Sequence, residues 1–297
     1  MNSLRQDPGQ ADRETPWRRF VRANIVPRVL VILVGVPLLV LAALRGGLVF
    51  RMLIGVLILQ GLREFTAMTA AKGYGPCKPL SLAVGLACAW AGASSGSHLP
   101  LVLAVAIVLV MIVELFRREI RHPIVITGNT ILGALYVGWL GSFIVQLREL
   151  PSPPGAGYDL GLRALGLMAA ITWACDTFAY LVGVAVGSRP LLERVSPRKS
   201  LEGALGGVLG AVAAGVTASA TFAPFISLAQ GALIGLAGSV LAQAGDLVES
   251  LLKRDAGIKD TAGLLPGHGG VLDRMDSVLF TAPFVYFVIV RLTEYRG

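Results

Sequence analysis

The feature that most constrains this chain is its series of long, uninterrupted apolar runs, for example residues 26–44, 99–117 and 275–293. Each run approaches the roughly 20 residues that a helix needs to cross the hydrocarbon core of a bilayer. Only helices and closed barrels pair all of their backbone polar groups inside a membrane. Because these runs are continuous and do not alternate with polar residues, they favour helices over a barrel.

The composition supports a membrane protein. Only 15% of the 297 residues are charged, whereas a soluble domain has roughly a quarter. We therefore predict an all-α, polytopic integral membrane protein with about nine transmembrane helices. The division of 203–252 into two spans depends on the turn-like Thr221-Phe222-Ala223-Pro224. The predicted spans are 26–44, 48–70, 79–95, 99–117, 126–147, 159–184, 203–221, 226–252 and 275–293.

The net charge of +8 is interpreted through membrane topology, because basic residues collect in cytoplasmic loops. With the N-terminus in the cytoplasm, nineteen of the 26 lysines and arginines fall on the cytoplasmic side and six on the outer side. Nucleic-acid binding is therefore not expected.

Residues 1–25 are predicted to be a flexible cytoplasmic tail, and 26–44 a retained span without a convincing cleavage site. Residues 26–297 are predicted to be a single transmembrane catalytic domain, and the three cysteines show no metal-ligand spacing.

The densest polar segment runs from Asp246 to Asp276. Asp246, Glu249, Ser250 and Lys253 are spaced i, i+3, i+4 and i+7, which forms one polar stripe on a helix. A charged residue inside a membrane helix costs about 2.5–3.5 kcal/mol on insertion scales. The stripe is therefore expected to face a polar cavity at the cytoplasmic end of its span.

The second half of this segment suits a polyphosphate ligand and its metal ion. Gly267-His268-Gly269-Gly270 forms a turn that lets backbone N–H groups approach an anion. Asp273 and Asp276 then share one face at the start of the last span. Mg²⁺ prefers a few carboxylates together with phosphate oxygens. His268 is expected to contact phosphate or position the loop rather than act as a base. The basic residues that suit polyphosphate are Lys253, Arg254, Lys259 and Arg274.

A second constellation surrounds the end of the sixth span. Asp176 and Tyr180 share a helix face at i, i+4, and an intramembrane aspartate is a functional candidate. The run from Ser196 to Glu202 resembles a helix start, with Ser200 as the N-cap. The alternative is a capped helix beside a solvated basic loop. A helix N-terminus with Lys199 beside it is suited to binding phosphate.

A third feature is the adjacent pair Arg63-Glu64 inside the second span. Adjacent residues do not share a helix face, so the two side chains are not expected to pair with each other. Two interpretations remain open, an interhelical salt bridge and part of a lipid entry path.

The C-terminal motifs closely resemble the phosphatidate cytidylyltransferase family. That family has an Asp-x-x-Glu-Ser lead-in, present here from Asp246, and its Ser-Pro-x-Lys-[Ser/Thr]-x-Glu-Gly loop is present from Ser196. Its Asp-[Ser/Thr]-x-Ala-Tyr motif begins at Asp176. One departure is Val184, where the family often has a basic residue. The hallmark positions matched are Ser250, Lys253, Arg254, Lys259, Asp260, Pro266, His268, Gly269, Gly270, Asp273, Arg274 and Asp276.

The resemblance implies transfer of CMP from CTP to phosphatidic acid, giving CDP-diacylglycerol and pyrophosphate. It implies Mg²⁺ on Asp246 and Asp273, with Asp276, Asp260 and Glu249 as further candidate ligands. It leaves open a second cation and a homodimer. It places a multi-pass enzyme in the inner (plasma) membrane, with the active site at the cytoplasmic face and formed mainly by 172–203 and 243–277. The implied catalytic residues are Asp246, Asp273, Lys253 and Asp276. The implied substrate-binding residues are Asp176, Tyr180, Ser196, Lys199, Glu202, Glu249, Arg254, Lys259, Asp260, His268, Gly269, Gly270 and Arg274.

Three other functions fit the sequence less well. A transporter also has intramembrane acids, but the polar residues here gather at one end of the spans and no path across the membrane is apparent. A CDP-alcohol phosphotransferase needs an Asp-Gly-x-x-Ala-Arg stretch, which this chain lacks. A CTP-dependent polyprenol or lipid kinase would lack the His-Gly-Gly-x-x-Asp-Arg-x-Asp block that begins at His268.

Overall fold

The computed structural model describes residues 31–94, 97–117, 122–258 and 270–294, and most of these residues are helical. The π-helices are η1 (Val31–Gly35) and η2 (Ala134–Trp139). The α-helices are α3 (Val36–Arg45), α4 (Gly47–Ala71), α5 (Lys78–Ala93), α6 (Leu99–Leu115), α7 (Pro123–Gly133), α8 (Leu140–Arg148), α9 (Leu160–Val186), α10 (Leu201–Thr221), α11 (Leu228–Asp255) and α12 (Leu272–Glu294).

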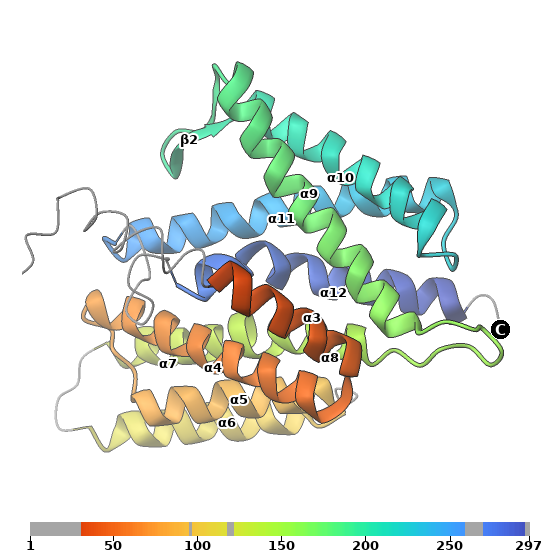
Figure 1. The fold of residues 1–297 in the computed structure, drawn as a ribbon. Coiled ribbons are helices and arrows are strands. Elements are labelled where there is room, and N and C mark those ends of the chain that lie inside the picture. The colour runs from red at the N-terminus through yellow and green to blue at the C-terminus, as the bar shows by residue number, and fades with distance from the viewer. Residues whose placement is uncertain (1–30, 95–96, 118–121, 259–269, 295–297) are drawn as a thin grey trace, which may run out of the picture.

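The helices form two packed groups that meet along α12. In Figure 1, α3 to α8 lie together in the lower part of the view, and α9 and α10 lie side by side above. α11 packs between α10 and α12, and α12 in turn contacts α8, α9 and α4. The main hydrophobic core is continuous across this junction and includes Phe50, Leu167 and Leu279, none of which exposes any surface. The two groups therefore share one core, and α12 is at its centre.

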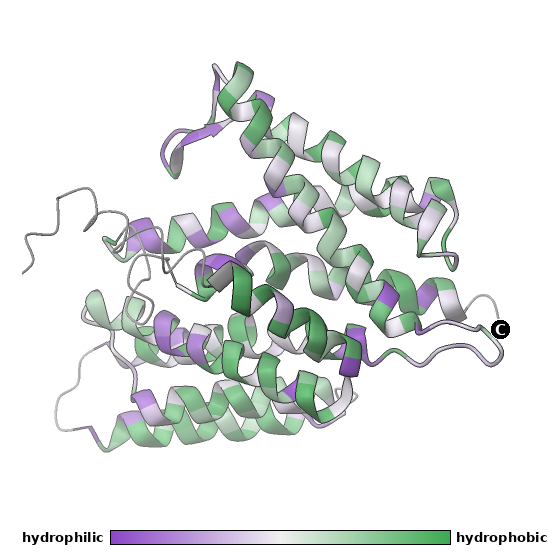
Figure 2. Ribbon diagram, viewed as in Figure 1, coloured by the Kyte–Doolittle hydropathy of each residue, from purple (hydrophilic) through white to green (hydrophobic). Residues whose placement is uncertain are grey.

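Five helical segments within the described residues are long and apolar enough to cross a membrane. They are 123–148, 160–186, 201–221, 228–255 and 272–293. Two shorter apolar helices are Leu33–Arg45 and Leu99–Leu115. The predicted division of 203–252 is confirmed, because α10 and α11 are separate helices. Figure 2 shows that apolar residues predominate along the helices, and that hydrophilic residues occur at the left ends of α11 and α12. This is the pattern of a multi-pass membrane protein.

Side chains at the N-terminal ends of three helices satisfy backbone N–H groups that have no partner inside the helix. Asp159 accepts from Leu162 N at the start of α9, and Ser200 accepts from Gly203 N at the start of α10. Ser227 and Gln230 form a reciprocal capping box at the start of α11. The predicted N-cap role of Ser200 is confirmed.

The segment before α10 is a short β-hairpin rather than an early helical turn. Strand β1 (Pro190–Leu192) pairs antiparallel with β2 (Ser196–Ser200), and α10 begins only at Leu201. Proline fits poorly in a helix interior, and Pro197 lies within β2. The run from Ser196 to Glu202 was expected to begin a helix. Only its last part does so, because Ser200 is the N-cap and α10 begins at Leu201.

Glycines let α10 approach α9 closely. A Cβ atom added at Gly206 would lie 2.5 Å from Val182 Cγ2, and one added at Gly210 would lie 2.6 Å from Phe178 Cδ2. Small residues at helix contacts are common in membranes, where close van der Waals packing drives association. The close contact fixes the hairpin, which follows α9 and precedes α10, relative to the rest of the chain.

Candidate active site

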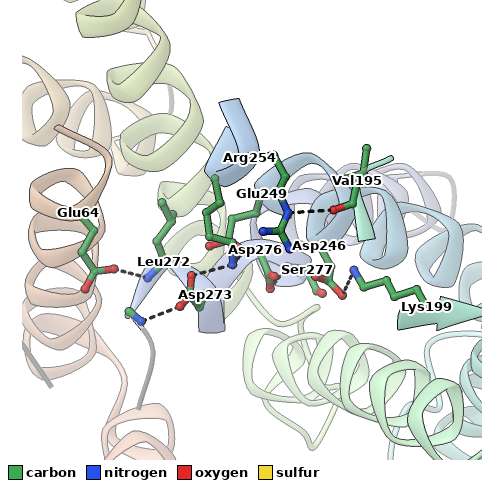
Figure 3. Close-up of polar contacts among 12 residues, drawn as sticks. Glu64, Val195, Lys199, Asp246, Glu249, Arg254, Leu272, Asp273, Asp276 and Ser277 are labelled. Atoms are coloured by element: carbon green, nitrogen blue, oxygen red, sulfur yellow. Dashed lines mark hydrogen bonds and ion pairs between the residues drawn. The ribbon is translucent and has the colours of Figure 1, made fainter. Parts of the chain in front are cut away.

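Three carboxylates from two helices meet at one end of the bundle. Asp246 and Glu249 lie one turn apart on α11, and Asp276 lies in the first turns of α12. One oxygen from each lies within 4.8 Å of the other two. Figure 3 shows the three side chains converging between the two helices. We refer to these three residues as the acidic cluster.

The acidic cluster is partly buried although its members carry like charges. Glu249 is 1% exposed and Asp276 is 8% exposed. Ser277 N donates to Asp276 Oδ1 over 2.6 Å, whereas Glu249 Oε1 has no hydrogen-bond partner among the described residues. Buried carboxylates this close repel one another unless cations compensate them.

Two lysines supply part of that compensation. Lys199 Nζ, from strand β2, lies 2.6 Å from Asp246 Oδ2. Lys253 Nζ lies 2.7 Å from Glu249 Oε2 and 3.1 Å from Asp273 Oδ1. The hairpin and α12 are therefore both joined to α11 by ion pairs at the cluster. Lys199 and Lys253 are far apart in sequence, and both contact carboxylates of this site.

Asp273, the second predicted metal ligand, is not one of the three carboxylates of the acidic cluster, but it shares Lys253 with Glu249. Its Oδ2 accepts from Gly270 N over 2.8 Å, and its Oδ1 contacts Lys253. The structure thus groups Asp246 with Asp276 and Glu249, and places Asp273 beside Lys253 on the same first turn of α12. Both carboxylate oxygens of Asp273 face polar partners.

The predicted residues of α9 and the hairpin differ in their contacts. Asp176, on α9, interacts electrostatically with Asp246 and Lys199. It is therefore close enough to the acidic cluster to contribute to its negative charge. Tyr180 is 70% exposed and makes no hydrogen bond with the described residues. Ser196 opens strand β2, where it pairs with Leu192.

Glu202 and Arg254 hold the hairpin in place. Glu202 accepts from Ser188 N (3.1 Å), Ser188 Oγ (2.8 Å) and Arg189 N (3.2 Å), which ties the start of α10 to the chain before β1. Arg254 Nε, on α11, donates to Val195 O over 3.4 Å. Arg274 is exposed on α12. The predicted residues Lys259, Asp260, His268 and Gly269 lie outside the described residues.

One residue at this end was not assigned to the site from the sequence. Glu64, on α4, accepts from Val271 N and Leu272 N at the start of α12, with distances of 3.0 and 2.8 Å. The sequence left open an interhelical salt bridge or part of a lipid entry path for the pair Arg63-Glu64. The partners of Glu64 lie more than 200 residues away and are backbone groups, so no local pattern identifies them.

Comparison with known proteins identifies the family of this chain. A model of the cytidylyltransferase family matches residues 26–292. A phosphatidate cytidylyltransferase from Synechocystis is 33% identical over 285 residues, which cover 89% of this chain and 96% of the relative. One from Bacillus subtilis is 37% identical over 165 residues, 54% of this chain and 58% of the relative. A chloroplastic one from Arabidopsis thaliana is 34% identical over 268 residues, covering 82% and 66%. The chain therefore belongs to the cytidylyltransferase family.

Proposed function

We propose that this protein transfers CMP from CTP to phosphatidic acid, forming CDP-diacylglycerol and pyrophosphate. The observation that carries the proposal is the acidic cluster with Lys199 and Lys253 beside it, in a chain of this family. Such a site suits a nucleoside triphosphate and a metal ion. Relatives named phosphatidate cytidylyltransferase support the identity of both substrates.

In this reaction, a phosphate oxygen of phosphatidic acid forms a bond to the α-phosphorus of CTP. The bond from that phosphorus to the oxygen bridging the α- and β-phosphates breaks, and pyrophosphate leaves with the electron pair. The attacking phosphate is already anionic, so the chain needs no general base. Positioning and neutralisation of charge carry most of the catalysis in phosphoryl-type transfers. Lys199 and Lys253 are placed to contact phosphate oxygens when their carboxylate partners are engaged elsewhere.

The acidic cluster suits Mg²⁺. Its carboxylate oxygens are the hard ligands that Mg²⁺ prefers, and Glu249 Oε1 is buried without a hydrogen-bond partner among the described residues. Asp246 and Asp273 remain the predicted metal ligands, and Asp276 and Glu249 supply further oxygens near Asp246. A bound Mg²⁺ stabilises negative charge on the phosphates.

We further propose the topology inferred from the sequence, with nine spans, a cytoplasmic N-terminus and the acidic cluster at the cytoplasmic face of the inner membrane. The distribution of lysine and arginine supports it. All members of the cluster come from one chain, so the proposal does not require a second copy. Alkaline phosphatase fused after Gly297 should be active on the outer side, and fused within 189–194 it should be inactive. The reverse pattern would overturn the orientation.

The reaction is tested with purified protein, phosphatidic acid and CTP labelled at either the α- or the γ-phosphate. Transfer of CMP puts the α-label in lipid and the γ-label in pyrophosphate, and should require Mg²⁺. The Asp246→Asn variant, purified in parallel, controls for contaminating host enzyme. A folded protein that leaves both labels in CTP would contradict the proposal. Transfer of the γ-label to a polyprenol would instead indicate the lipid kinase.

A further inference from the structure

Glu64 is a buried acid whose two oxygens are both occupied by another helix. The residue is 6% exposed on α4. Its Oε1 accepts from Val271 N and its Oε2 from Leu272 N, while Gln60 Nε2, one turn earlier on α4, donates to Oε1 over 2.9 Å. The neighbouring Arg63 is exposed. The contact is therefore interhelical, as one of the two sequence interpretations required, but the partners are backbone N–H groups rather than a cation.

This arrangement is a helix cap supplied from a distant part of the chain. The first N–H groups of a helix have no partner within the helix, and a carboxylate at that end also gains from the helix dipole. Such caps normally come from the residue just before the helix, as with Ser200 on α10. On α12 the cap is provided by Glu64, a residue of α4. The position of the first turn of α12 is thus set by α4.

The same turn of α12 carries the carboxylates of the site. Asp273 directly follows the capped Leu272, and Asp276 lies three residues further on. Figure 3 shows Glu64 on one side of this turn and the acidic cluster on the other. A rotation of the turn that broke the Glu64 contacts would also move Asp273 away from Lys253, which lies 3.1 Å from it.

A second contact joins α4 to the other helix of the cluster. Lys72, the residue after α4, forms an ion pair with Asp255, the last residue of α11. The end of α11 and the start of α12 are therefore both fixed to the end of α4. Both side chains of this pair are exposed, so its contribution is small. Glu64 is the buried and stronger of the two connections.

We propose that Glu64 is a positioning residue for the transfer reaction, holding the first turn of α12 so that Asp273 and Asp276 face α11. The inference rests on the proposed function and adds to it a residue outside the C-terminal motifs. Replacing a group that orients a metal ligand without contacting the metal typically lowers metal affinity or activity by about 10- to 100-fold.

The test compares Glu64→Gln with Glu149→Gln. Both replacements remove one negative charge with almost no change in shape, and Glu149 pairs with Arg51 at the opposite end of α4. In Glu64→Gln the side-chain NH₂ group faces a backbone N–H, so one capping contact is lost. The readouts are kcat, Mn²⁺ binding by electron paramagnetic resonance without nucleotide, and hydrogen exchange of the peptide 270–280. Gln60→Leu is a milder second variant in case Glu64→Gln fails to fold.

We expect Glu64→Gln to lower kcat by at least about tenfold, to weaken Mn²⁺ binding and to speed exchange in 270–280. Gln60→Leu should change the same three quantities less, and Glu149→Gln should change none. Unchanged Mn²⁺ binding and exchange in Glu64→Gln would overturn the positioning role, as would equal losses in Glu149→Gln. A wild-type protein that makes no CDP-diacylglycerol refutes the proposed function alone, because Mn²⁺ binding and hydrogen exchange still test Glu64.

Discussion

Buried charges have different surroundings at the two ends of the helix bundle. At the end without the cluster, Arg148 is 8% exposed and donates to Ala43 O and Leu44 O, while it also pairs with Asp159. Its charge meets complementary groups at the ends of neighbouring helices. At the other end, three carboxylates lie within 4.8 Å of one another, and Glu249 keeps a buried oxygen without a hydrogen bond from the described residues.

We interpret this difference as one between charges that stabilise the fold and charges that are proposed to bind a ligand. A buried ion with complementary partners stabilises the structure only if those partners remain. A concentration of like charge lowers stability until a cation or a polyphosphate with its metal arrives, and functional sites commonly carry such a cost. The comparison therefore predicts that replacements at the two ends affect different properties.

The largest effect is expected for Asp246→Asn in the acidic cluster. Turnover should fall by about 10³-fold or more, because the change removes a predicted metal ligand and charge that acts in the transition state. Thermal stability should change little, because the decrease in repulsion with Asp276 and Glu249 is offset by the loss of the ion pair with Lys199. Activity assays and thermal unfolding of the purified variant measure both. A variant that loses stability while keeping turnover would break the distinction between the two ends.

For Arg148→Met, at the end opposite the acidic cluster, a large loss of stability is expected. The replacement leaves two helix-end carbonyls without their donor and should lower the free energy of unfolding by about 3 kcal/mol. Activity per folded molecule should match that of the wild type. Unfolding in denaturant and an assay normalised to folded protein measure the two quantities. A specific loss of kcat without a loss of stability would contradict the assignment.

The smallest effects are expected for the helix caps, which allow a matched pair. Ser200→Ala and Ser227→Ala should each lower stability by about 1 kcal/mol, because each removes an acceptor at a helix N-terminus. Only Ser200→Ala should also lower activity, since Ser200 directly follows Lys199 at the cluster. Equal activity in the two variants would mean that the start of α10 takes no part in the reaction.

Much of the helical fold was predictable because it follows from local apolar runs. The expected span 159–184 is observed as α9 from Leu160 to Val186, and 126–147 lies within the continuous segment 123–148. The turn around Pro224 correctly separated α10 from α11. The hairpin was missed because its strands are only three and five residues long and lack the alternating apolar pattern that identifies a strand.

The site was predictable only where its residues are neighbours in sequence. Asp246, Glu249 and Lys253 share a helix face, and that spacing is visible directly. The selection of Asp276 rather than Asp273 for the cluster depends on how α12 is rotated against α11, which no local pattern sets. The role of Glu64 depends on a contact between α4 and the start of α12, so it appears only in three dimensions.

The glycine contact between α9 and α10 has a consequence for mutational tolerance. Alanine is ordinarily the mildest replacement in a helix and improves on glycine by about 1 kcal/mol in intrinsic propensity. At Gly206 and Gly210 the added methyl group would meet Val182 and Phe178, so the usual ranking of substitutions is inverted. Substitutions on this face of α10 are thus limited by the size of the side chain rather than by its polarity. Its lipid-facing side, where Leu205 and Leu209 are exposed, can exchange one apolar residue for another.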